Sequence, residues 1–304
     1  MGRIELAPAA PDDWPLACRL ALGGTPADVS DTRVLRLLQF VQTGKFDPAG
    51  LILALRRGTP VGAIAAQLLP GSTGVVLPPF GPDAATRVAL VRAAREYFHR
   101  SGTVLAHCLL GIGESQHAAP LLAGGFRRIT QIQHRLRQIP IVPDATRGGA
   151  EGLNFIPFSD SLESVFARVL ERTYVDTLDL PETTVDRPAS QQLAGYRQDQ
   201  TDPPHWWLAE RPGEDPIGVV MLSESEMPRT GEIAYLGLVP EARGRGFGQA
   251  LILQGISAAN RAGILNLGLS VDVRNSPAIQ LYHDHLFRIY NLQDLYLLRL
   301  CDKN

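Results

Sequence analysis

The stretch "PEARGRGFGQAL" (residues 240–251) decides how the second half of this chain is interpreted. Three glycines and two arginines occupy five of the six positions from Arg243 to Gly248, where an apolar strand pattern gives way to a helical one. Glycine weakens a helix interior but lets the backbone approach a ligand closely. The free N–H groups at a helix N-terminus carry the positive end of its dipole. The stretch therefore predicts a phosphate- or pyrophosphate-binding turn; the alternative is a tight turn with solvated arginines.

The spacing of these glycines separates this turn from other phosphate-binding loops. Neither GxxxxGK[ST] nor GxGxxG is present, and R-x-x-G-x-G remains. That pattern resembles the acetyl-CoA pyrophosphate loop of the GNAT superfamily of acetyltransferases, [QR]-x-x-G-x-[GA]. A second stretch, "VDVRNSPAIQLYHDHLF" (271–287), resembles the family's N-x-x-[AS]-x-x-[LF]-Y motif with a later aromatic residue. The matching residues are Asn275, Ala278, Leu281, Tyr282 and Phe287.

The resemblance implies a set of residues that bind acetyl-CoA. The glycine-rich turn would wrap the diphosphate, and the backbone of the preceding strand would pair with the pantetheine arm and polarise the thioester carbonyl. Asn275 would either bond the pantetheine or cap its own helix. The expected cofactor-binding residues are Leu236, Gly237, Leu238, Arg243, Gly244, Arg245, Gly246, Phe247, Gly248 and Asn275.

The resemblance also implies two catalytic residues. Glu232 lies eleven residues before Arg243, where some family members carry a catalytic glutamate, and would take a proton from an amine directly or through water. An ordinary carboxylate is too weak a base for an ammonium, so burial must raise its pKa or the amine must arrive neutral. Tyr282 would protonate the departing thiolate. The alternatives are an exposed carboxylate at a strand start and a core aromatic residue. Regular alternation would place Glu232 on one face with Leu236 and Leu238.

The chain has 304 residues, and its two halves resemble each other weakly. Pro60 and Pro216 are 156 positions apart, and "APLLAGGFRR" from Ala118 echoes "AIQLYHDHLFRI" from Ala278. We expect a GNAT-like domain at 1–140, a linker at 141–152 and an acetyl-CoA-binding GNAT domain at 153–304. The first would be a degenerate copy, because "LPPFGPDA" (77–84) replaces the glycine-rich turn and prolines remove N–H donors there. Tandem GNAT proteins, mycothiol synthase among them, have this layout.

The expected fold is α/β (α+β), with two tandem domains that each contain a mixed, mostly antiparallel, twisted sheet flanked by helices. A hairpin should join the strands at 217–224 and 231–239, and the strand at 264–273 should run parallel to the latter. "DLYLLRL" (294–300) should close the second sheet, and Ser276 should cap its helix. The other second-half elements are strands at 153–158 and 205–210, helices at 161–174, 246–262 and 276–286, and a short helix within 174–204. The first-half elements are strands at 51–56, 61–69, 73–79, 103–110 and 129–136 and helices at 11–22, 31–43, 84–100 and 117–124.

Composition excludes several classes of function. A formal net charge of −2 supplies no field to attract nucleic acid or an anionic membrane. The three cysteines lie far apart without CxxC spacing, so neither a zinc site nor a disulfide framework is expected. No apolar run reaches the roughly 20 residues that span a bilayer, and no secretory signal is visible. We expect a cytoplasmic protein without a bound metal, nucleic acid or membrane partner.

These features together predict an N-acyltransferase that moves an acetyl group from acetyl-CoA directly to a primary amine of a small molecule or polypeptide. The alternative is a non-catalytic protein that senses or scaffolds acyl-CoA. No sequence pattern identifies the acceptor, the oligomeric state or the role of the first half.

Overall fold

The computed structural model describes residues 3–23, 31–140, 152–184, 188–197, 205–225 and 227–300. The chain divides into two compact units, residues 1–130 with 293–304 and residues 131–292. We call these the first and the second unit. Two long strands, β6 (Arg127–Gln138) and β12 (Arg288–Arg299), each run from one unit into the other.

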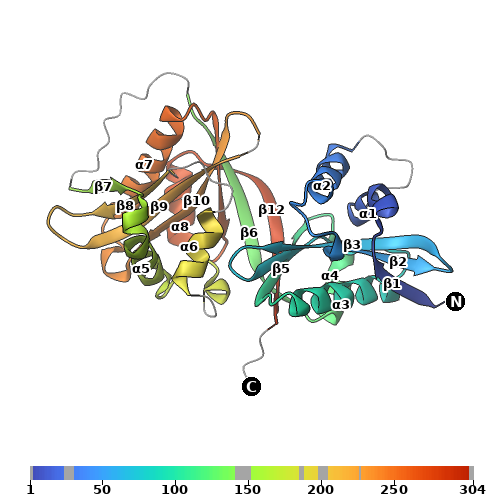
Figure 1. Cartoon of the computed structure of the whole chain (residues 1–304). Helices are drawn as coiled ribbons and strands as arrows, with labels where there is room; N and C mark the ends of the chain where they lie inside the picture. The colour runs from blue at the N-terminus through green and yellow to red at the C-terminus, as the bar shows by residue number, and fades with distance from the viewer. Residues whose placement is uncertain are drawn as a thin grey trace. The chain divides into compact units, whose positions relative to one another are not determined.

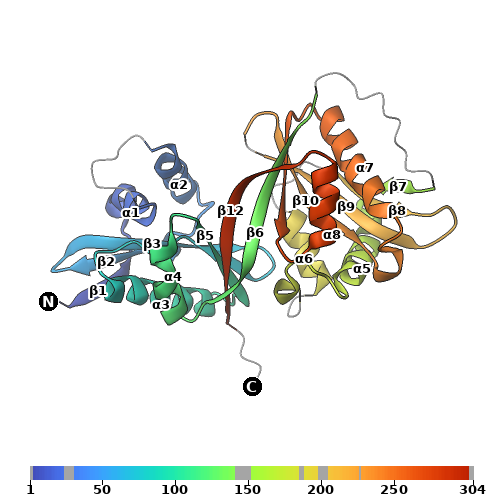
Figure 2. The ribbon, with the colours of Figure 1, turned by 180° about the vertical axis from the view of Figure 1, so that it is seen from behind.

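The first unit is a mostly antiparallel sheet with helices on both faces. Figures 1 and 2 show α1 and α2 on one face of this sheet and α3 and α4 on the other. Only β4 and β5 pair in parallel among its described strands. Its strand order is β1 (Ile4–Pro8), β2 (Leu51–Arg56), β3 (Thr59–Leu69), β4 (Thr73–Val76), β5 (Leu105–Gly111) and the Gln293–Arg299 part of β12. Its helices are α1 (Trp14–Ala21), α2 (Thr32–Gln42), α3 (Ala84–Arg100) and α4 (Ala118–Ala123).

The second unit repeats this plan. Figure 1 shows α5 and α6 in front of the sheet of the second unit, and Figure 2 shows α7 and α8 on its opposite face. The strand order is β6, β11 (Asn266–Asp272), β10 (Thr230–Leu238), β9 (Pro216–Glu224), β8 (Trp206–Glu210) and β7 (Asn154–Pro157). The helices are α5 (Glu163–Tyr174), α6 (Ala189–Arg197), α7 (Phe247–Arg261) and α8 (Ser276–Asp284). The mixed, mostly antiparallel sheets flanked by helices are as predicted.

The local signals of the second unit explain its central elements. The short joint after β9 forms the expected antiparallel hairpin with β10, and β11 returns parallel to β10 after the α7 crossover. α7 buries an apolar stripe that includes Leu251, Ile252 and Ile256, and it ends at Gly263, whose φ of +72° suits a residue without a Cβ. This crossover places the N-terminus of α7 next to the end of β10.

The structure differs from the sequence prediction at the ends of the repeats. Residues 293–299, expected to close the second sheet, pair with β5 of the first unit, and β6 closes the second sheet by pairing with β11. A sequence repeat with an offset of 156–160 residues cannot reveal which copy of an equivalent strand each sheet accepts. β1 was not predicted. The linker at 141–152 lies outside the described residues except for Gly152, and the boundaries 1–140 and 153–304 stay a prediction.

In the described parts of the chain, none of the helices combines the length and apolar character needed to cross a membrane.

Candidate active site

The two central strands of the second unit separate partway along their length. β10 pairs in parallel with β11 only from Thr230 to Glu232, opposite Asn266 to Gly268. Beyond that point β10 continues along β9 as far as Leu238, and β11 continues along β6 as far as Asp272. The facing edges of the separated strands therefore carry backbone groups available to an extended ligand that adds between them.

A β-bulge in β10 changes which side chains share a face. The register shifts between Ile233 and Tyr235, which adds one residue to β10 against β9. Ile233 packs against Gly255 of α7, whereas Tyr235 contacts Tyr174 of α5 on the opposite face. Glu232 therefore lies on the face of Tyr235 and Gly237. The predicted sharing of a face with Leu236 and Leu238 is wrong, because regular alternation was assumed through the bulge.

The glycine-rich turn presents a row of unused backbone donors. Gly244 and Gly246 have φ values of +70° and +84°, which only glycine adopts without strain. In the described structure the backbone N–H groups of residues 244–248 donate to no backbone oxygen, and no side chain caps α7. Five consecutive amides at the positive end of a 15-residue helix thus have no acceptor in the described structure. The unpaired N–H groups and the positive end of the helix dipole both favour binding of a pyrophosphate group.

The corresponding helix of the first unit is closed to an anion. The Asp83 carboxylate caps α3, accepting hydrogen bonds from Thr86 N at 2.8 Å and from Thr86 Oγ1 at 2.7 Å. This carboxylate occupies the position that a phosphate would take and repels a second negative charge. The contrast between α3 and α7 supports the interpretation of the first half as a copy without a pyrophosphate site.

Arg243 and Arg245 have different surroundings. The Arg243 guanidinium donates to the backbone oxygens of Leu238 at 3.1 Å, Asp176 at 3.0 Å and Thr173 at 2.9 Å. It therefore ties the end of β10 to the C-terminal end of α5. The Arg245 guanidinium lies 5.3 Å from the centre of the Phe247 ring on an exposed surface, where it remains available to a phosphate.

Glu232 stands at the point where β10 leaves β11. Its Oε1 accepts a hydrogen bond from Ser270 Oγ at 3.3 Å. Surrounding protein atoms raise the pKa of its carboxyl above the usual range, and the Ser270 hydrogen bond opposes this rise. The side chain still reaches solvent. A carboxylate with these properties is a better proton acceptor than an ordinary surface glutamate.

Tyr282 and Asn275 belong to α8. Tyr282 is 7% exposed and contacts the Phe287 ring edge to face. Burial, and then the charge of Asp179, raise the pKa of its phenol, which therefore stays protonated. Asn275 caps the helix, because its Oδ1 accepts from Ala278 N at 3.3 Å. The cap is Asn275 and not Ser276 as predicted; Asn is an equally good capping residue.

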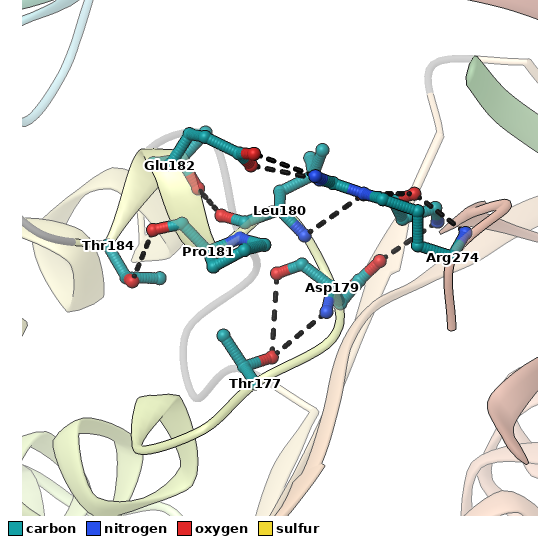
Figure 3. Close-up of polar contacts among 9 residues, drawn as sticks. Thr177, Asp179, Leu180, Pro181, Glu182, Thr184 and Arg274 are labelled. Atoms are coloured by element: carbon teal, nitrogen blue, oxygen red, sulfur yellow. Dashed lines mark hydrogen bonds and ion pairs between the residues drawn. The ribbon is translucent and has the colours of Figure 1, made fainter. Parts of the chain in front are cut away.

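A loop after α5 contacts both separated strands, and Figure 3 shows its polar contacts with Arg274. On the β10 side it is held by Arg243. On the β11 side, Asp272 N donates to Asp179 Oδ1 at 2.9 Å. The buried Asp272 carboxylate pairs with Arg274, whose guanidinium also donates to both Glu182 carboxylate oxygens, at 2.7 and 2.9 Å. These contacts fix residues 176–182 beside the opening between β10 and β11, where an acceptor would approach.

Sequence reasoning missed the polar residues on β11 and in this loop. Ser270 and Asp272 alternate with aliphatic residues in "LGLSVDV" (267–273), which is a signal for one polar strand face. Their partners His134 and Asp179 lie 90 or more residues away in sequence, so only the fold shows that they meet.

Comparison with known proteins agrees with this geometry. The model of the acetyltransferase (GNAT) family matches residues 172–286. A mycothiol acetyltransferase from Thermomonospora curvata is 30% identical over 212 residues, which are 68% of this chain and 67% of that protein. One from Streptomyces griseus subsp. griseus is 26% identical over 193 residues, 61% of this chain and 59% of that protein.

Two solved structures share the fold along the whole chain. A GCN5-related N-acetyltransferase from Sphaerobacter thermophilus superposes with a TM-score of 0.66 at 19% identity, covering 98% of this chain and 96% of that chain. A tandem GNAT protein from the clavulanic acid biosynthesis pathway has a TM-score of 0.59 at 15% identity and covers 99% and 100%. The predicted tandem GNAT layout is confirmed. The chain belongs to the GNAT family and is an N-acetyltransferase.

Proposed function

We propose that this enzyme transfers an acetyl group from acetyl-CoA directly to a primary amine held in the same complex. The observation that carries the proposal is the row of unused amides at residues 244–248 beside the opening between β10 and β11. The amides would bind the pyrophosphate, with Arg245 adding charge, and the freed edge of β10 at Leu236–Leu238 would pair with the pantetheine arm.

In this proposal the side chains around the opening move the protons. Glu232 accepts a proton from the acceptor amine, aided by its raised pKa, and the neutral amine attacks the thioester carbonyl. Tyr282 donates its phenolic proton as the C–S bond breaks and the thiolate leaves. The extra proton on the acceptor nitrogen then returns to the phenolate, directly or through water. Direct transfer needs no cysteine nucleophile, and the two cysteines in the described residues, Cys18 and Cys108, are both buried. Asn275 has its Oδ1 committed to the helix cap, so only its amide nitrogen would be available to the pantetheine.

The acceptor is proposed by class. The relatives named mycothiol acetyltransferase make deacetylated mycothiol the first small molecule to test, followed by a panel of amino sugars and peptides with free amino termini. The loop at 176–182 faces this acceptor.

The test separates catalysis from binding. We expect Glu232→Gln and Tyr282→Phe each to lower kcat by roughly 10²- to 10⁴-fold, the usual size of general acid–base contributions. Titration calorimetry should show unchanged CoA affinity. Glu171→Gln, at an exposed site on α5, is the matched control. A wild type that binds CoA but acetylates nothing on the panel would favour the sensor alternative, and full activity in both variants would remove their proposed roles.

A further inference from the structure

Glu232 is the end of a chain of polar side chains that crosses three neighbouring strands. Ser270 Oγ lies 3.3 Å from Glu232 Oε1 and 3.0 Å from His134 Nδ1. The backbone register places these residues within reach of one another independently of side-chain placement. Ser270 is directly opposite His134 in the β11–β6 ladder, and Gly268, two residues earlier on the same face, is opposite Glu232. Directly opposite residues have Cβ atoms about 5 Å apart.

The directions of these hydrogen bonds follow from the number of protons. A serine hydroxyl has one proton, and an ionised carboxylate can only accept. When Ser270 donates to Glu232, its oxygen must accept from His134, so Nδ1 of that imidazole must carry a proton. If the imidazole did not donate, the hydroxyl could rotate away from the carboxylate. His134 therefore determines where the Ser270 proton points.

The surroundings hold the imidazole in place. The Tyr290 ring, on the part of β12 that belongs to the second unit, lies 6.2 Å from the His134 ring centre to centre. The contacts from Glu232 to Ser270, from Ser270 to His134 and from His134 to Tyr290 gather four side chains on one face. Burial, and then the negative charge of Glu232, raise the pKa of Tyr290. The next charge along β11, Asp272, is engaged by Arg274.

From this geometry we infer that His134 and Ser270 are positioning residues for Glu232. The inference rests on the proposed role of Glu232 as the base. His134 aims the Ser270 hydroxyl at Oε1, which fixes the carboxylate and leaves Oε2 to take the amine proton. His134 comes from β6, in the half of the sequence that lacks its own pyrophosphate site. The first half thus supplies a residue to acetyl transfer, and this gives the exchanged strand a catalytic purpose.

The first experiment compares pH profiles of kcat/KM for the wild type, Ser270→Ala and His134→Phe. Phenylalanine keeps a ring against Tyr290 but has no nitrogen. A hydrogen bond to the charged form of an acid lowers its pKa. Loss of the Ser270 hydrogen bond should move the acid limb of the kcat/KM profile to higher pH by about one unit in either single variant. The double variant should show the same shift, because both substitutions remove the same hydrogen bond. His134→Asn, whose amide nitrogen can replace Nδ1, should restore the wild-type profile.

Matched controls exclude a general effect of substitution. His99→Phe on α3 and Ser257→Ala on α7 alter exposed residues outside this cluster and should leave the profile unchanged. Unshifted acid limbs in both Ser270→Ala and His134→Phe, with an active wild type, would overturn the inference.

A second experiment needs no turnover. Nitrogen-15 NMR of the histidines should show a proton on Nδ1 of His134, and carbon-13 NMR should show the Glu232 titration midpoint rising in His134→Phe. An Nδ1 without a proton at neutral pH, or an unmoved midpoint, would contradict the chain. If the wild type acetylates no amine, the proposed function fails, while these spectra still decide the hydrogen-bonded chain.

Discussion

Glu232 and Tyr282 have pKa values displaced in the same direction, with different consequences for catalysis. Surrounding protein atoms favour the neutral form of each acid, although Glu232 is exposed and Tyr282 is buried. For Glu232 this makes the ionised form a stronger base, whereas for Tyr282 it keeps the proton on the phenol until a thiolate needs it. These are the protonation properties that the proposed reaction needs, a more basic Glu232 carboxylate and a Tyr282 phenol that stays protonated.

The first prediction concerns pH dependence. Because the pKa of Glu232 is raised, the base is lost by protonation at a higher pH than for an ordinary glutamate, near 4.3. The acid limb of kcat/KM should therefore lie above pH 4.3 and disappear in Glu232→Gln. Because the pKa of Tyr282 is also raised, its ionisation should produce no alkaline limb below about pH 10. Steady-state rates from pH 4 to 10 check both. An acid limb at an ordinary carboxylate value would contradict the role of Glu232.

At the level of elements, the turn before α7 depends on backbone conformation more than on side chains. Gly246 has a φ of +84° and nothing within 4 Å of a Cβ built on it. Alanine there would not clash, but a left-handed backbone costs an ordinary residue about 1–2 kcal/mol. The turn would then relax, and its N–H groups would no longer converge.

The second prediction uses this conformational requirement at Gly246. Gly246→Ala should weaken CoA binding roughly tenfold, since 1.4 kcal/mol corresponds to a factor of ten. Gly263→Ala is the matched control, because Gly263 has a φ of +72°, has similarly open surroundings and lies at the other end of the same helix. Both variants should lose similar stability in thermal unfolding, and only Gly246→Ala should lose affinity in calorimetry. Equal affinities would show that the turn does not bind the pyrophosphate.

The elements also show how far sequence reasoning could reach. "PEARGRGFGQAL" (240–251) predicted the turn, its helix and its place after a strand, because glycine spacing and apolar periodicity are local signals. The bulge after Ile233 was not predictable, since "GEIAYLGL" (231–238) has no glycine or proline at the extra residue. Arg243 matched the family pattern, but two of its three bonds to backbone oxygens go to Thr173 and Asp176, about 70 residues away. Tertiary contacts thus gave a recognised residue an unpredicted structural role.

In the whole molecule, the two halves are joined by more than their linker. Each half of the sequence contains the strand that completes the sheet of the other unit, since β6 pairs with β11 and residues 293–299 pair with β5. Tyr296 and Leu298 consequently belong to the same apolar core as Phe98 and Phe126. Because the two halves of the sequence exchange equivalent strands, neither half contains all the strands of one sheet.

The third prediction tests this exchange. Leu298→Ala should open a cavity in the core of the first unit, although residue 298 ends the second half of the sequence, and lower the free energy of unfolding by about 2–5 kcal/mol. Native-state hydrogen exchange should show faster exchange of β5 amides while β8 and β9 keep their protection. Leu208→Ala, at a residue that is 1% exposed in the second unit, should have the converse effect. If Leu298→Ala instead exposed β10 and β11 and left β5 protected, the last strand would complete the second sheet, as the sequence repeat implies.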